Sequence, residues 1–213
     1  MSEAIEQLPT TNRIEAFSDG VFAIVITLLV LELRVPQIKD ELSSWELRQA
    51  IVHLGPKFLG FAISFFIIAI FWVNHHQLFH SIKRSTRMLL WLNNLLLLFL
   101  TFIPFPTAMM GEYPNNPFAV MFFGATMTAA GGAFTLLRWY ATIKARLFGE
   151  DSDEKMIRRN FRRSLAGPLL YLTASIVALF STKIAYAIYI IVPCLYFIPS
   201  LESREQKKAE AQL

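Results

Sequence analysis

The 213-residue sequence contains a single cysteine and few charged residues. Cys194 has no second cysteine to pair with, so an internal disulfide is excluded, and we interpret the residue as a small apolar filler. Charged residues make up only 17% of the chain, whereas hydrophobic residues make up 54%. This balance is too apolar for a soluble domain of that length, so it indicates an integral membrane protein.

Long apolar runs alternate with clusters of charge, as expected when lipid solvates the runs and water solvates the clusters. We therefore predict an all-α membrane protein in which residues 1–213 form one unit with six transmembrane helices per subunit. The six runs are 16–33, 58–79, 88–109, 118–140, 165–180 and 184–200. The last two are short for a span of about 20 residues, so a re-entrant hairpin is the alternative to two crossings.

Basic residues predict the orientation of these runs, because Lys and Arg in short loops resist translocation. They gather after the second, fourth and sixth runs, whereas the turn at 111–117 carries none. We therefore expect both termini to face the cytoplasm, with 201–213 forming a charged cytoplasmic tail. Residues 1–12 lack the basic residues of a signal peptide, so the first run should stay in the mature protein. The net charge of +4 is explained by this topology, which argues against nucleic-acid binding.

A short helix is predicted between the first two runs. Ser43 with Glu46 three residues later forms a capping-box pattern that begins it, and Gly55 followed by Pro56 is expected to end it. Apolar residues recur within it at helical spacing. This pattern fits either a helix on the outer membrane surface or an ordinary packed loop helix.

Small residues and prolines predict how the helices pack and bend. Gly124, Thr128 and Gly132 recur every four residues in the fourth run, which favours close approach of another helix. Prolines near the end of the third run, including Pro104, and Pro193 in the sixth run predict kinks or helix ends. None of these patterns implies chemistry.

Polar side chains within the apolar runs are few, and each is costly in hydrocarbon unless it pairs, lines water or acts. We infer one buried cluster in which the Asp19 carboxylate accepts hydrogen bonds from an imidazole and a carboxamide. Either it fixes helix positions or it handles ions or protons directly. No metal site is expected, because His76 and His80 lack further ligands at a matching spacing. The cluster candidates lie at similar depth from the cytoplasmic ends of the first three runs: Asp19, His75, His76, Asn93 and Asn94.

The first run carries a stripe of residues at steps of three and four, and Asp19 points about 140° away from it. The stripe faces either lipid and core or a pore made by several copies, because one subunit this apolar cannot line an aqueous path alone. In a pore, apolar side chains would form a hydrophobic constriction and hydroxyls would coordinate ions. The stripe contains Gly20, Ile24, Thr27, Leu28 and Leu31, and Arg13 and Phe17 continue it toward the cytoplasm.

The string Arg13-x-x-x-Phe17-Ser18-Asp19-Gly20, with the apolar helix after it, resembles the signature of the transmembrane protein 175 family. That family comprises the endolysosomal potassium channels and their bacterial relatives. The resemblance extends over essentially the whole chain, as one six-helix unit. Further positions resemble a polar network of that family: His75 and His76 after Trp72, and Asn93 and Asn94.

The resemblance implies a potassium-selective homotetramer in a bacterial plasma membrane, with the first helices around a central pore. A TVGYG filter is absent from the sequence. By position, Ile24, Leu28 and Leu31 would form the constriction and Thr27 would be the selectivity candidate. The implied partners are potassium ions, further copies of the chain and the bilayer, with no cofactor. Phe17, Ser18 and Asp19, with the His and Asn groups, would hold the first helix in place. The signature and network residues together are Arg13, Phe17, Ser18, Asp19, Gly20, Trp72, His75, His76, Asn93 and Asn94.

Two other functions stay open from the residues alone. A membrane-embedded enzyme could use the Asp, His and Asn groups, but the chain has no H-E-x-x-H string or comparable catalytic motif. A proton-coupled secondary transporter could use Asp19 and a histidine as a relay, but no internal repeat supports that fold. We therefore expect a channel, with no catalytic residues.

Overall fold

The computed structural model describes residues 11–82, 84–148 and 154–197, and within these ranges the regular secondary structure is helical. The exception is an isolated bridge between Ile82 and Phe148. The predicted tail at 201–213 lies outside the described residues. The helices are α1 (Asn12–Leu28) with a 3₁₀ turn η1 (Leu29–Glu32), α2 (Ser44–His53), α3 (Gly55–His80), α4 (Arg87–Phe102), α5 (Pro104–Glu112), α6 (Pro117–Trp139) with a π turn η2 (Tyr140–Lys144), α7 (Glu154–Ala178) and α8 (Thr182–Phe197).

Four helical segments in the described residues are long and apolar enough to cross a membrane. They contain nearly all of the first four predicted runs, so that part of the prediction is confirmed. The fifth run proves to be the end of a much longer helix, α7, whose first half is rich in arginine. The sixth falls in α8 as far as Phe197, and its end at 198–200 lies outside the described residues; the apolar part of α8, Thr182–Cys194, is shorter than the four spans. The four segments are Asn12–Glu32, Gly55–His80, Arg87–Glu112 and Pro117–Lys144.

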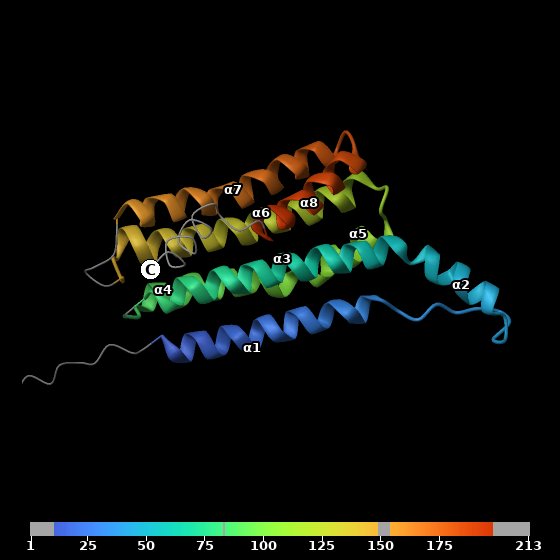
Figure 1. Ribbon diagram of the computed structural model, residues 1–213, viewed down its shortest axis with the longest axis horizontal. Helices are drawn as coiled ribbons and strands as arrows, with labels where there is room; N and C mark the ends of the chain where they lie inside the picture. Colours follow the sequence, from blue (N-terminus) through green and yellow to red (C-terminus); the bar gives the residue numbers. More distant parts are fainter. Residues whose placement is uncertain (1–10, 83, 149–153, 198–213) are drawn as a thin grey trace, which may run out of the picture.

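The long helices run side by side in one elongated bundle (Figure 1). α1 lies along one edge and packs on α3 and α4, while α7 lies along the opposite edge and packs on α6. α8 returns beside α7 and also contacts α3 and α6. The two edges of the bundle are therefore formed by α1, which packs on α3 and α4, and by α7, which packs on α6 and α8.

The predicted helix between the first two runs is α2, which projects beyond one end of the bundle (Figure 1). Its N-cap is Ser43, whose hydroxyl accepts from the backbone N–H of Glu46 at 3.3 Å. The Glu46 carboxylate accepts from the N–H groups of Lys39 and Asp40, which organises the loop before the helix. None of its residues is buried, and Gly55 begins α3 directly after it.

The helix of the third run is interrupted at the first of its two prolines. α4 ends at Phe102 and α5 begins at Pro104, with Ile103 between them. Pro104 has no N–H to donate to the carbonyl of Leu100, four residues earlier. That carbonyl accepts from the N–H of Ile103 at 3.1 Å instead. The span is therefore one membrane crossing made of two helices.

Small residues bring α6 close to α7 and α8, although only partly at the predicted positions. A Cβ at Gly124 would overlap the Tyr189 hydroxyl of α8, so the prediction holds there. A Cβ at Gly131 would lie 3.1 Å from Pro168 of α7, whereas Gly132 has no heavy atom within 4 Å of that position. The prediction for Gly132 is therefore wrong, because the contact is made one residue earlier, about 100° around the helix.

Pro168 in the middle of α7 also creates a polar requirement that α6 meets. A proline cannot donate to the carbonyl four residues before it, which here belongs to Ser164. The hydroxyl of Thr135 on α6 donates to that carbonyl at 2.8 Å. A backbone group that would otherwise be unpaired in hydrocarbon thus becomes a bond between two helices.

We predict that Thr135→Val lowers the free energy of unfolding by about 1–2 kcal/mol, because the Ser164 carbonyl loses its partner. Thr173→Val is the matched control, since the Thr173 hydroxyl bonds only within its own helix, to Leu169 at 2.9 Å. Thermal unfolding of the two purified variants in detergent measures the difference. Equal midpoints for both would show that the cross-helix bond contributes nothing.

Candidate functional site

α1 has two distinct faces. Its buried face meets α3 and α4 and is built from residues at steps of three and four: Ile14, Ser18, Phe22, Val25 and Leu29. The predicted stripe falls on the other side, where Ile24 is 59%, Leu28 41% and Leu31 65% exposed. Within the described part of the subunit, the stripe is therefore largely uncovered.

The stripe offers few polar atoms, and these have a defined orientation. The Thr27 hydroxyl donates to the carbonyl of Ile24 at 2.8 Å, so its hydrogen is turned back along the helix. The oxygen keeps its lone pairs, the arrangement that suits a cation. Gly20 has no heavy atom within 4 Å of a would-be Cβ, and Phe17 is exposed, as is Arg13.

A buried polar chain ties α1 to two other helices. The ring N–H of His75 on α3 donates to the side-chain oxygen of Asn93 on α4 at 2.8 Å. The Asn93 amide then donates to the Ser18 hydroxyl of α1 at 2.9 Å. All three residues are at most 1% exposed. We call Ser18, Asn93 and His75 the polar anchor, because they join three helices by directional bonds.

Aromatic rings enclose the histidine of the polar anchor. Phe79 stacks on the His75 ring with centroids 4.3 Å apart, and Phe22 of α1 meets it edge-on at 5.5 Å. These rings exclude water from the imidazole, which strengthens its hydrogen bond and raises the cost of losing it.

Asp19 lies outside the polar anchor, contrary to the expectation that its carboxylate is the buried acceptor. It is exposed in the subunit and accepts from the indole N–H of Trp72 at 2.9 Å. One residue along a helix is a rotation of about 100°, which places Ser18 inward and Asp19 toward the exposed side of α3. The Ser18 hydroxyl is therefore the buried acceptor on α1, a role that was expected of the Asp19 carboxylate.

The second members of the histidine and asparagine pairs are also exposed. His76 and Asn94 lie outside the polar anchor. The His76 ring stacks with Trp72 at 6.0 Å and with His80 at 6.4 Å, forming a column along α3. Among the described residues there is no group of three or more side chains that could hold a metal ion.

Two polar features escaped sequence reasoning. Ser64 of α3 and Thr107 of α5 form a buried hydroxyl pair at 2.7 Å, and Thr107 donates onward to the carbonyl of Ile103. Their positions inside apolar runs were the available signal. The second feature is an open cavity of about 530 Å³ where α1 ends, lined in part by Glu32, Arg34 and an ion pair between Lys57 and Glu112.

We predict that Asn93→Leu destabilises the protein by about 2 kcal/mol or more, because it leaves the Ser18 hydroxyl and the His75 ring without their partner. Asn94→Leu makes the same chemical change at the neighbouring exposed position and should be nearly neutral. Thermal unfolding and the elution profile of both purified variants provide the comparison. Similar losses in the two would contradict the anchor.

The family model described as "Endosomal/lysosomal potassium channel TMEM175" matches residues 13–104, which include the stripe and the polar anchor. A potassium channel of Chamaesiphon minutus is 38% identical over 200 residues, covering 92% of this chain and 97% of that protein. A potassium channel of a Chryseobacterium species is 36% identical, covering 89% of this chain and 94% of that protein.

More distant and structural relatives agree. The endosomal/lysosomal proton channel TMEM175 of Homo sapiens is 30% identical over 203 residues, covering 88% of this chain and 40% of the human protein. The crystal structure of a lysosomal potassium-selective channel TMEM175 homologue from Chamaesiphon minutus superimposes with a TM-score of 0.77. That match has 34% identity and covers 87% of this chain and 95% of the other.

These relatives are named as ion channels, which confirms the expectation that the chain is not an enzyme. The resemblance found in the sequence is also confirmed. Two independent features agree with it, namely the match over α1 to α4 and the helical fold shared along most of both chains. The chain is an integral membrane protein of the TMEM175 family.

Proposed function

We propose that the chain is the subunit of a potassium-permeable channel, in which the α1 helices of several copies surround a central pore. The observation that carries this proposal is the uncovered stripe on α1, a helix at the edge of the bundle (Figure 1). The relatives named as potassium channels, which match along most of their length, support potassium as the permeating ion.

The stripe suits a pore lining better than a surface for lipid alone. It combines large apolar side chains with Gly20 and the Thr27 hydroxyl, so it offers both narrow apolar rings and a place for partial coordination. Ile24, Leu28 and Leu31 would form the constriction, which gates by dewetting or by tight fit around the ion. A ring of Thr27 oxygens would replace part of the hydration shell of potassium.

The subunit number that we propose is four, which is the number that the resemblance to the family implies. A single copy this apolar has too little polar surface to line an aqueous path alone, so conduction requires α1 from each of several copies. The polar anchor supports this role, because it fixes which face of α1 points away from α3 and α4. Asp19 and Arg13, exposed at the same end of α1, are proposed to lie near the inner mouth and contacts between copies.

We further propose six crossings per subunit, with both termini in the cytoplasm of a bacterial cell and the protein in the plasma membrane. Basic residues support this orientation, because they gather where α3, η2 and α7 begin or end on one side of the bundle. α7 and α8 would supply the last two crossings, with the arginines at 158–163 near the start of α7 at the level of the lipid headgroups.

We predict that Ile24→Ser raises conductance or weakens discrimination between potassium and sodium, because a hydroxyl wets the constriction. Ile26→Ser is the matched control, since it makes the same change at a half-buried position that lies about 100° or more from every residue of the stripe. The measurement is planar-bilayer recording of the purified proteins under a potassium-to-sodium gradient.

The same recording tests the wild-type function. We expect a reversal potential that follows the potassium gradient and does not move when a pH gradient is imposed. A reversal potential that follows pH would favour the proton permeation for which the animal relatives are named. No current, or equal effects of the two substitutions, would contradict the proposed pore.

A further inference from the structure

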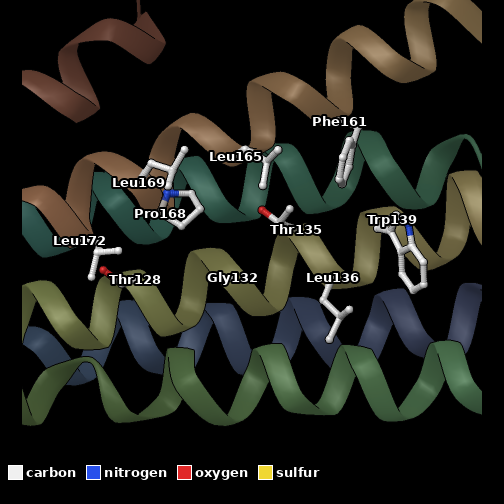
Figure 2. Close-up of a pocket in the computed structure, with 10 residues that line it drawn as sticks. All are labelled: Thr128, Gly132, Thr135, Leu136, Trp139, Phe161, Leu165, Pro168, Leu169 and Leu172. Carbon is white, nitrogen blue, oxygen red and sulfur yellow. The ribbon is translucent and has the colours of Figure 1, made fainter.

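An open groove of about 370 Å³ runs between α6 and α7, on the edge of the bundle opposite α1. Figure 2 shows that its side chains come from these two helices. The volume lies within the range of sites that hold small-molecule ligands. The proposed function leaves this groove without a role.

The wall of the groove is apolar even at its two threonines, because their hydroxyl groups are hydrogen-bonded within the protein. The Thr128 hydroxyl donates to the carbonyl of Gly124 at 2.8 Å, and the Thr135 hydroxyl donates to Ser164. Both hydrogens are thus used within the protein, and the two threonines offer their methyl groups. Gly132 exposes bare backbone, and Leu165 and Leu169 are partly exposed on the opposite wall.

The groove has the length of one lipid leaflet. Its lining on α7 extends from Phe161 to Leu172, a rise of about 16 Å at 1.5 Å per residue. Half of a bilayer's hydrocarbon core is about 15 Å thick. A straight acyl chain lying along the groove would therefore run from the membrane surface to the bilayer centre.

Cations mark one end of the groove. Arg158 and Arg162 are exposed and fall on the face of α7 that carries Leu165, seven and three residues before it, so they flank Phe161, where the lining on α7 begins. On the α6 side, the Lys144 ammonium lies 5.6 Å from the ring centroid of Trp139, which lines the groove. An aromatic ring beside cations is typical of the level of lipid headgroups.

From this order of apolar wall, aromatic ring and cations we propose that the groove is a binding site for an anionic phospholipid. One acyl chain lies between α6 and α7, and Arg158, Arg162 and Lys144 hold the phosphate and the charged headgroup. The groove is lined by α6 and α7, and α7 lies at the opposite edge of the subunit from α1, so this site can stay open to lipid while α1 faces other copies (Figure 1).

The test is native mass spectrometry of the full chain in detergent, titrated with phosphatidylglycerol or phosphatidylcholine of identical acyl chains. We expect preferential retention of phosphatidylglycerol. Arg158→Gln with Arg162→Gln should weaken it about tenfold or more, with little change for phosphatidylcholine. Arg84→Gln with Arg87→Gln is the control, since it removes two exposed cations at the same end of the bundle but away from the groove.

A second variant tests the apolar part. Gly132→Leu places a side chain in open space, so the fold should persist by thermal unfolding while binding of both lipids falls. Equal retention of the two lipids by the wild type, or equal losses in the two arginine double variants, would overturn the proposal. Unchanged lipid binding by Gly132→Leu would also overturn it. A changed oligomeric state of Gly132→Leu would overturn it too, because it would show that a second copy of the chain fills the groove.

Discussion

The rotation of α1 about its own axis is the constraint on which the rest of the structure depends. α1 touches its own subunit along one face only, and a shift of one residue turns a side chain by about 100°. Apolar packing alone tolerates such rotations, because several large side chains of α1 could fill the same space. A rotation of α1 would break the hydrogen bond from Asn93 to Ser18, which is itself linked to the bond from His75 to Asn93. Each buried polar group left unpaired costs about 1–3 kcal/mol.

The same constraint separates neighbouring polar residues into inner and outer members. Ser18, His75 and Asn93 are buried and bonded to one another, whereas the residues that follow them in sequence are exposed in the subunit. The inner set holds three helices in register. The outer set is available to water, lipid or other copies, with Asp19 already engaged by Trp72.

The sequence predicts the first four crossings well, because hydrocarbon requires long uninterrupted apolar runs. It misses the beginning of α7 at Glu154, since hydropathy does not register a helix that is rich in arginine over its first half. The helix end at Pro104 is predicted correctly, because the missing backbone N–H of a proline interrupts the helix at that position whatever lies around it. Contacts between helices are harder to predict: the choice of Gly131 over Gly132 depends on where Pro168 of another helix lies.

The error at Asp19 has a similar cause. Burial was inferred from depth along the helix, but depth does not give the direction in which a side chain points. The stripe of α1 was predicted from its period, and its exposure in the subunit agrees with that pattern. Its orientation toward a shared axis depends on copies that one subunit does not contain.

Accessibility of the stripe to a thiol reagent during conduction tests this orientation most directly. In a Cys194→Ala background, Leu28→Cys should be blocked by a small water-soluble thiol reagent applied to the open channel, whereas Ile26→Cys, about 160° away around α1, should be affected little. Block at position 28 that potassium slows would support a pore-lining α1. A current that is unchanged at position 28, with labelling only by a lipid-soluble reagent, would place the stripe against acyl chains and contradict the account.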